Sequence, residues 1–454
     1  MAAQPQTNPF LSGVWAPMHE ELDLLDLQVT GTIPPALDGR YLRIGPNPIK
    51  PDPRFYHPFI GDGMVHGIAI SGGKADWYRN RFIRSRRVSK LMGVEPAPGP
   101  RHGGGDTVNT SVAVIAGHIY GLIEGGSTPV QLRDDLSDQA YSDFGGTLAG
   151  AFTAHPHRDP QTGETHAITY QWMEPGKAAH VVLDVGGRVI TEELLGLPHG
   201  PMIHDCAFTG RYVVILDMPA AFVPEAAKAG SPFPYAWQPD LPCRVGLLPR
   251  SGGTADIVWC DAPLSYVYHV ANAYDRAAGK VVLDVCAFDT MFAETGDRSR
   301  GLERWIVDPD AGAITIRSVD GRPQDFPRID ERRFGQQHRY VYTLSQPERP
   351  DDPAPGGSVV YAHDMETGAV AAHDFGQGCF PGEFVFVPKA PGSTENDGWL
   401  MGLVIDSTSE TTDLVILDAR GIDRGPVAAI HIPHRVPPGF HGSWVPSGPA
   451  NSDA

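Results

Sequence analysis

The sequence predicts an all-β protein, built either as a β-propeller or as a pair of β-sandwiches. Glycine (52) and proline (43) together make up about a fifth of the 454 residues, which is typical of many short strands joined by turns. A short turn motif recurs along the chain, and patterns typical of helices are scarce. Hydrophobic residues amount to 41% of the chain, which is enough for a sizeable core.

The sequence predicts a short N-terminal tail followed by a domain that begins with β-hairpins. Residues 1–8 are expected to be disordered, and residues 9–454 are expected to form one domain. Alternating apolar segments on both sides of Gly72 and Gly73 predict a β-hairpin within residues 59–83. A second pair of strands is expected in residues 111–124.

The repeated pattern D-x-x-(T/A)-G predicts a tight hairpin, in which a type I turn is followed by a left-handed glycine. It begins at Asp159, Asp275, Asp308 and Asp364, and each copy precedes a strand-like run. Spacings of 116 and 56 residues fit a unit of about 55–60 residues, whereas the spacing of 33 does not. About seven such units would fill the chain, as in a propeller that repeats a four-stranded blade.

Few segments predict helices or long loops. Short helices are expected in residues 131–144 and in part of residues 288–305. Residues 219–240 are rich in proline and too apolar for a simple hairpin loop. They are expected to form a lid or mouth for an apolar ligand, or else a loop packed onto the body. The aromatic residues of this segment are Phe222, Phe233, Tyr235 and Trp237.

Charge and cysteine content limit the partners and the compartment. The net charge of −18 argues against nucleic acid as a partner, because phosphate repels an acidic protein. The five cysteines are loosely spaced and include no CxxC, which favours a reducing compartment over disulfides. A signal peptide is not expected at the N-terminus, and no apolar run reaches the length of about 18 residues that a membrane span needs. We expect a cytoplasmic protein with no obligate protein partner.

Four histidines stand out because each lies in a distinctive segment of apolar or small residues. They are His155 in TAHPH, His204 in MIHDCAF, His269 in YVYHVANAYD and His441 in PPGFHGSW. Their spacings are 49, 65 and 172 residues, so only a fold that joins distant segments, such as a radial one, would bring them together. They are candidate metal ligands, although a hydrogen-bonded core role stays open for each. His66, His157 and His434 are further candidates.

Four histidines around one ion favour a metal that binds oxygen or changes oxidation state. Four imidazoles would close the tetrahedron of zinc, whereas six-coordinate iron keeps two positions open. A ligating histidine usually donates its second ring N–H to a carboxylate or carbonyl. Glu124, Asp325 and Glu383 lie in apolar segments and are candidates for this role, with caps, turns or salt bridges as the alternatives.

Motifs of other enzyme classes are missing from the sequence. We find no G-x-S-x-G elbow, no P-loop and no G-x-G-x-x-G that opens a helix. Nucleotide cofactors and serine hydrolysis are therefore disfavoured.

A series of segments extends over nearly the whole chain. They are LDGRYLRIGPNP, FIGDGMVHG, NTSV, GLIEGGSTP, TAHPHRDPQTGE, MIHDCAFTGRYVVILDMP, YHVANAYD, DFPRIDERRFG, PGEFVFVP, DGWLMGLVID and PPGFHGSW. In content and order they resemble the carotenoid cleavage oxygenases, also called carotenoid cleavage dioxygenases, and in particular a bacterial member that acts on apocarotenoids. The resemblance implies a seven-bladed β-propeller with a dome of loops and short helices over one face.

The resemblance also implies a metal centre. One non-haem Fe²⁺ per chain would lie on the propeller axis, held by His155, His204, His269 and His441. The carboxylates that support the histidines in this family fall on Glu124, Asp325 and Glu383. Asp325 stands where the family usually has glutamate, so a longer or water-bridged contact is expected there. Thr110 matches a threonine beside an open iron position.

The implied reaction is oxidative cleavage of one C=C bond of a conjugated, apolar molecule by O₂. Each of the two carbonyl products receives one oxygen atom, and the alkene supplies the electrons, so no reductant is needed. The protein would position a rigid apolar chain beside the metal.

A carotenoid or apocarotenoid is the expected substrate. Ile123 stands where stilbene-cleaving relatives have a lysine that holds the phenol. The expected substrate contacts are Ile123, Phe222, Phe233, Tyr235 and Trp237. A stilbenoid or other phenylpropenoid is the alternative, and a propeller that binds lipophiles without catalysis is a further one. Phe222 and Trp237 would also anchor a weak peripheral contact with a membrane, which the net charge of −18 opposes.

Overall fold

The computed structural model describes residues 8–103, 105–231, 233–292, 296–349, 352 and 354–448. Residues 1–7 of the expected tail lie outside this part of the chain. Asn8 lies inside it, and its side-chain oxygen accepts a hydrogen bond from the N–H of Phe10. Within the described residues the only α-helices are α1 (Arg86–Met92) and α2 (Pro224–Lys228), which confirms the all-β class.

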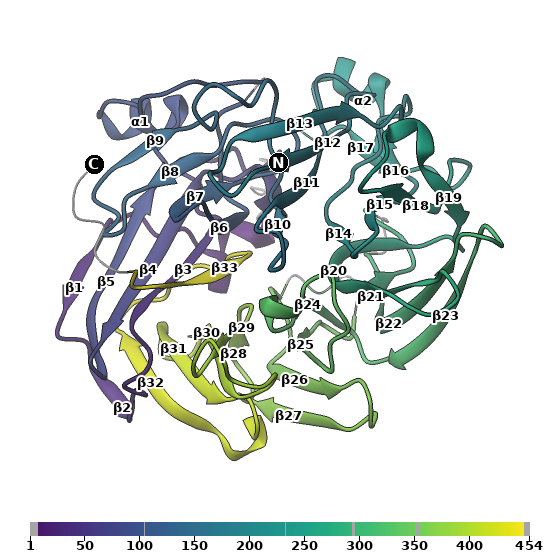
Figure 1. Cartoon of the computed structure of the whole chain (residues 1–454). Coiled ribbons are helices and arrows are strands. Elements are labelled where there is room, and N and C mark those ends of the chain that lie inside the picture. Colours follow the sequence, from purple (N-terminus) through teal and green to yellow (C-terminus); the bar gives the residue numbers. More distant parts are fainter. Residues whose placement is uncertain are drawn as a thin grey trace, which may run out of the picture.

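Antiparallel sheets form a ring, the arrangement of a β-propeller (Figure 1). The first two blades are β1 (Asp23–Leu25), β3 (Gly39–Pro46), β4 (Gly63–Ser71), β5 (Lys74–Phe82) with β33 (Gly442–Pro446), and β6 (Ser111–Ile115), β7 (His118–Leu122), β8 (Val130–Leu132), β9 (Gln139–Tyr141). The third is β10 (His157–Arg158), β11 (Thr165–Thr169), β12 (Ala179–Leu183), β13 (Val189–Leu194).

The next two blades share one eight-stranded sheet. They are β14 (Cys206–Phe208), β15 (Tyr212–Asp217), β18 (Arg244–Pro249), β19 (Val258–Asp261), and β20 (Tyr266–Asp275), β21 (Val281–Phe288), β22 (Ser299–Asp308), β23 (Ala313–Asp320). A single parallel pair, Asp261 with Ala313, joins the two units at their outer edges. The hairpin of β16 (Ala220–Phe222) and β17 (Tyr235–Trp237) stands apart from the blades.

The last two blades return to the N-terminus. They are β24 (Gln324–Arg328), β25 (Tyr340–Ser345), β26 (Val359–Asp364), β27 (Val370–Asp374), and β28 (Cys379–Pro381), β29 (Val385–Pro388), β30 (Gly398–Asp406), β31 (Thr411–Asp418), β32 (Pro426–Ile432) with β2 (Val29–Gly31). The ring is closed twice, because β33 pairs with β3 and β2 pairs with β32 (Figure 1, purple beside yellow). Among the described residues the sheets therefore provide seven blade units, as the resemblance implied.

Burial follows the position of a strand in its blade. Outer strands such as β13 and β27 alternate between exposed and partly buried residues, as a strand with one solvated face does. Strands nearer the axis, such as β14 and β21, are buried along their whole length. Because adjacent blades cover both faces of these strands, the core lies between the blades, with Trp305 fully buried in its largest cluster.

The predicted hairpin turns are confirmed. Each D-x-x-(T/A)-G copy joins two paired strands, and the final glycines Gly163, Gly279, Gly312 and Gly368 all have positive φ. Asp275 and Asp308 begin different turns of one blade, which explains their spacing of 33 residues. Asp308 and Asp364 begin the same turn in neighbouring blades, 56 residues apart.

Neither predicted helix is found in the described residues; residues 293–295 of the second prediction lie outside them. Residues 131–144 contain β9 and most of β8, joined by a turn in which the Asp135 carboxylate accepts hydrogen bonds from the Ser137 N–H and hydroxyl. Such local side-chain bonds favour a turn over a helix. In residues 288–305, the part that begins at Ser299 is β22, which pairs with β21 and β23 on its two sides.

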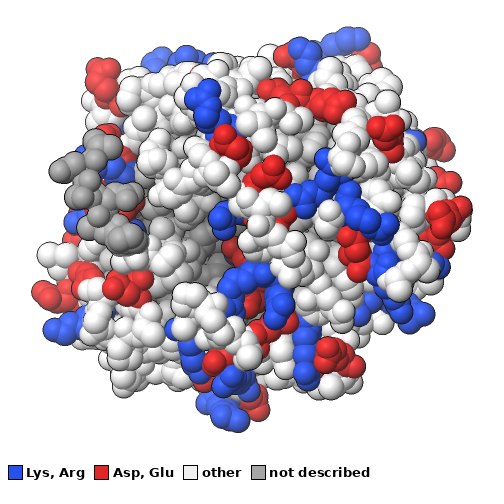
Figure 2. Space-filling model, in the orientation of Figure 1, with Lys and Arg blue, Asp and Glu red and all other residues white. Residues whose placement is uncertain are grey.

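Acidic and basic side chains are interspersed over the face in Figure 2, which is hollowed near its middle.

Candidate metal centre

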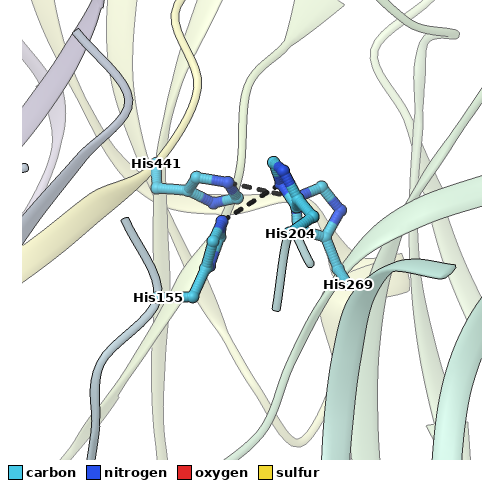
Figure 3. Close-up of side chains that lie close together, drawn as sticks. All are labelled: His155, His204, His269 and His441. Carbon is cyan, nitrogen blue, oxygen red and sulfur yellow. Dashed lines mark hydrogen bonds between the residues drawn. The ribbon is translucent and has the colours of Figure 1, made fainter. Parts of the chain in front are cut away.

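The four histidines identified in the sequence meet near the middle of the ring (Figure 3). One nitrogen from each lies within 4.8 Å of the others. His155, His204 and His441 stand one or two residues before the inner strands β10, β14 and β33, and His269 lies within β20. The start of an inner strand is thus the common position that brings segments from different blades to one point.

The Nε2 atoms of neighbouring rings are in direct contact (Figure 3, dashed). Their separations are 3.1 Å for His155 and His204, 3.2 Å for His204 and His269, and 3.1 Å for His269 and His441. All four side chains are largely or fully buried.

Three of the rings are oriented by carboxylates that contact their Nδ1 atoms. Glu124 Oε1 lies 3.0 Å from His204 Nδ1, and Glu383 Oε1 lies 2.9 Å from His441 Nδ1. Asp325 Oδ1 lies 2.9 Å from His269 Nδ1. The expected longer or water-bridged contact at Asp325 is therefore wrong.

A bulge in β24 explains how the shorter side chain reaches its histidine. The pairing with β25 shifts between Asp325 and Arg328, and Phe326 adopts a positive φ of 54°. Bulges re-aim side chains in this way. The same bend stacks the Phe326 ring on His269, with 4.9 Å between the centroids.

Burial and neighbouring charges shift the pKa values of the residues in the site. Burial lowers the pKa of His441, and burial and the neighbouring histidines hold the pKa of His155 well below its ordinary value. Burial alone would lower the pKa of His269 too, but the Asp325 carboxylate outweighs burial and raises it. Burial would raise the pKa of Glu383, yet Arg328 and then His441 lower it to about 2. The carboxylate is thus ionised and accepts the ring N–H.

The donor set fits a divalent metal ion. A ring that donates its Nδ1–H to a carboxylate presents an unprotonated Nε2 when it is neutral. Lone pairs at about 3 Å from one another repel unless a cation lies between them. Two nitrogens at right angles around an ion, each about 2.1 Å from it, would be about 3.0 Å apart, close to the observed separations.

Thr110 connects this site to the second blade. Its carbonyl accepts a hydrogen bond from the His441 N–H over 3.0 Å, and its hydroxyl donates to Asn109. Thr110 also lies in the wall of a cavity that three of the histidines, His204, His269 and His441, line.

This cavity has a volume of about 700 Å³ and is walled by loops from several blades and by the β16–β17 hairpin. Ile123, Phe233 and Tyr235 line it, as expected. Phe222 and Trp237 are not among its lining residues; both are partly buried, and Trp237 packs against the largest core cluster.

Sequence reasoning missed several lining residues. They are the aromatic side chains of Phe59, Trp172, Tyr268, Phe288, Phe326 and Phe440. Phe440 directly precedes His441 and Phe326 follows Asp325, so their place beside site residues was the available signal.

A second cavity of about 850 Å³ is lined by His155, His269 and His441 together with His157 and Asp205. His157 and Asp205 form a buried pair, with 2.7 Å between Nε2 and Oδ1. Burial acts to raise the pKa of Asp205, but His157 and the Val270 N–H outweigh it and keep the carboxyl below its ordinary pKa.

The other two candidate histidines lie elsewhere. His66 contacts the Tyr78 hydroxyl, and neither His66 nor His434 belongs to a metal-binding cluster of the described residues.

Known proteins are similar to this chain in sequence and fold. The family described as retinal pigment epithelial membrane protein matches residues 15–446. The chain is 38% identical to a carotenoid cleavage oxygenase of Mycobacterium tuberculosis, over 98% of this chain and 99% of that one. It is 31% identical to the isoeugenol monooxygenase of Pseudomonas nitroreducens, over 98% and 100% of the two chains.

Solved structures agree with the sequence relatives. The lignostilbene dioxygenase of Pseudomonas brassicacearum matches with a TM-score of 0.87 and 27% identity, over 98% of this chain and 99% of that one. A cobalt-substituted apocarotenoid oxygenase of Synechocystis matches with a TM-score of 0.83 and 26% identity, over 95% and 97%. With the match to the family extending over residues 15–446, the chain belongs to the carotenoid cleavage oxygenase family.

Proposed function

We propose that this oxygenase is a ferrous-iron dioxygenase that cleaves one C=C bond of a carotenoid or apocarotenoid into two carbonyl products. One observation carries the proposal: four histidine nitrogens converge, and three of these histidines, His204, His269 and His441, line a cavity of about 700 Å³ with aromatic walls. A cavity of this size suits a single apolar ligand.

His155, His204, His269 and His441 would hold one Fe²⁺ per chain. A ferrous ion bound there would supply the binding and activation of O₂, the co-substrate. The carboxylates of Glu124, Asp325 and Glu383 hold three rings in the orientation that points Nε2 inward. Such supporting contacts fix the tautomer and raise the basicity of the ligand.

The chain's other task is to align the alkene and exclude water. The ring of Phe59 contacts those of Phe233 and Phe440 in the cavity wall, with 5.9 and 5.8 Å between the centroids. Flat conjugated molecules pack well against such rings. In the reaction the C=C bond breaks and each carbon takes one atom of O₂, so no proton donor or reductant is required.

The cavity wall supports a carotenoid-type substrate. Ile123 lies in the wall directly before Glu124, where a lysine would offer a charge to a phenol. Its contacts are apolar, because it packs against a buried cluster that includes Ile44 and Val108. The relative from Mycobacterium tuberculosis is itself named a carotenoid cleavage oxygenase.

A stilbenoid or other phenylpropenoid is the second candidate. The hydroxyl-bearing rings of Tyr170, Tyr235 and Tyr268 and the carboxylate of Glu124 line the same cavity. These groups hydrogen-bond phenols. Two relatives are named for such substrates, a lignostilbene dioxygenase and an isoeugenol monooxygenase.

The test is aerobic incubation of the ferrous protein with an apocarotenal and with resveratrol, followed by mass spectrometry of the products. An anaerobic sample and His204→Ala serve as controls. We expect oxygen-dependent aldehydes from the apocarotenal alone. Cleavage of resveratrol alone would replace the first candidate by the second. Iron-loaded protein that turns over no polyene or stilbene would support a lipophile-binding propeller without catalysis.

We further propose a cytoplasmic location with weak peripheral membrane contact. No helix in the described ranges is long and apolar enough to cross a bilayer. All five cysteines are free, as a reducing compartment requires. Because Phe222 and Trp237 are partly buried, they would anchor only weakly. Flotation with liposomes checks the contact, and protein that stays at the bottom of the gradient would exclude it.

A further inference from the structure

Asp205 is a buried carboxylate that contacts the segments of three of the four histidines. Its Oδ1 accepts hydrogen bonds from His157 Nε2 and from the N–H of Cys206, both over 2.7 Å. Its Oδ2 accepts a hydrogen bond from the N–H of Val270 over 2.8 Å. The residue is 4% exposed, and as an ionised carboxylate it can only accept.

These contacts link residues next to the metal-binding positions. His157 follows His155 by two residues, Asp205 directly follows His204, and Val270 directly follows His269. Consecutive Cα atoms are about 3.8 Å apart, so a shift of any of these contacts would move a histidine with it.

Asp205 reaches Val270 next to an irregularity in the pairing of β20 with β21. β20 is bulged here: Val267 pairs with Ala287 but Val270 pairs with Val285, which places His269 in the bulge. A bulge leaves backbone groups outside the regular ladder. β20 is the edge strand of its sheet, and the Val270 N–H donates to Asp205, which stands before β14, the first strand of another blade.

His441 is held by a separate set of contacts. Its N–H donates to the Thr110 carbonyl, its ring contacts Glu383, and the next N–H, of Gly442, donates to Glu383 Oε2 over 3.0 Å. Asp205 therefore acts on His155, His204 and His269 together and leaves the fourth ligand alone.

We propose that Asp205 is a positioning residue that fixes the spacing of these three histidines, and through it the metal affinity. This rests on the proposed metal centre. Asparagine has one acceptor oxygen in place of two, so Asp205→Asn cannot accept from both Cys206 and Val270 in the present geometry. At least one of the hydrogen bonds that Asp205 accepts near the histidines would be lost.

The experiment titrates metal-free protein with Co²⁺ in competition with a chelator and records the visible absorption bands of the bound ion. Asp217→Asn is the matched control. Asp217 is also fully buried and also pairs with a histidine, His199, and with Arg244, each over 2.8 Å, and it is not among the residues that line either cavity.

We expect Asp205→Asn to bind Co²⁺ about 10–100-fold more weakly than the wild type and to shift its absorption bands. Asp217→Asn should keep the wild-type spectrum and an affinity within about threefold of it, whatever it does to stability. Equal affinity and equal spectra for Asp205→Asn and the wild type would overturn the positioning role, and so would equal losses in both variants. A wild-type protein that binds no Co²⁺ would instead overturn the metal centre itself.

His157→Phe keeps the test decisive if Asp205→Asn does not fold. It retains a ring against Phe334, whose centroid lies 5.1 Å from that of His157, and removes the Nε2–H that donates a hydrogen bond to Asp205. We expect a shifted spectrum and weaker Co²⁺ binding. Unchanged spectrum and affinity would contradict the proposal.

Discussion

At the scale of single residues, the carboxylates behind the histidines also hold the surrounding backbone. Glu383 contacts the His441 ring with one oxygen, and with the other it accepts from the Gly442 N–H and contacts the Arg328 guanidinium. Asp205 combines its three contacts in the same way. Loss of one such group therefore affects both the ring and the strand that carries it.

Glu383→Gln should lower the affinity for Fe²⁺ or Co²⁺ about 10–100-fold, because the amide cannot serve the ring, the backbone and the guanidinium together. Competition with a chelator measures this. Glu303→Gln is the control, since Glu303 is also buried but contacts Arg300 and Trp305. Equal affinities for Glu383→Gln and the wild type would show that the carboxylate does not support a ligand.

Ile123→Lys should reduce cleavage of an apocarotenal and raise cleavage of resveratrol, because it places a cation in an apolar wall beside Glu124. The ratio of kcat/KM for the two substrates is the measurement, and Ile123→Met controls for size. If the lysine variant kept the wild-type ratio, residue 123 would have no part in the choice of substrate.

Single residues were the part of the site most open to prediction. Distinctive segments identified the four histidines, and the family resemblance assigned their carboxylates. The length of the Asp325 contact was not predictable, because it depends on a bulge and a positive φ at Phe326. Phe222 and Trp237 were misassigned to the cavity because composition does not tell which face of a hairpin a ring takes.

At the scale of elements, the turns could be predicted from the sequence, but whether a segment forms a strand or a helix could not always be. The D-x-x-(T/A)-G motif specifies its own conformation, so all four predicted turns are found. Residues 299–308 form a strand only because two neighbouring strands pair with them, and such pairing lies outside local sequence.

Substitutions at two glycines of the fifth blade distinguish backbone strain at positive φ from steric crowding by an added Cβ. Gly279 and Gly301 both have positive φ, but a Cβ on Gly301 would lie 2.1 Å from the Asp320 carbonyl oxygen, whereas the one on Gly279 would meet nothing within 4 Å. Gly279→Ala should cost about 1 kcal/mol of unfolding free energy, and Gly301→Ala about 1–3 kcal/mol more. Urea unfolding compares the two, and equal losses would contradict the crowding.

At the scale of the whole molecule, both chain ends complete the ring, and the site lies where the blades meet. β33 completes the first blade and directly follows His441, so the strand pairing that closes the ring also places the fourth histidine. The seven-unit count came from the resemblance, since the repeat alone was irregular.

Several histidines outside the metal centre are buried and neutral, which predicts loss of stability in mild acid. Burial lowers the pKa of His166 to about 3 and those of His180 and His363 to about 4. The unfolded chain takes up protons below pH about 6.5 and the folded chain does not, so stability is full above that pH and falls as the pH drops toward 4.

Each such histidine should cost up to about 2 kcal/mol between pH 7.5 and pH 5. The midpoint of urea unfolding at the two pH values measures the loss. His180→Gln should reduce the difference between them, and His118→Asn, at an exposed position, should leave it unchanged. A wild-type midpoint that is constant over this range would contradict the prediction.

The most direct test of the four-histidine centre as the site of oxidative cleavage is a brief incubation of the ferrous protein with ¹⁸O₂ and an apocarotenal. Mass spectrometry then locates the label before the carbonyl oxygens exchange with water. We expect one ¹⁸O atom in each of the two carbonyl products and no cleavage by His204→Ala. Label in only one product would contradict a dioxygenase, and full activity of His204→Ala would contradict the site.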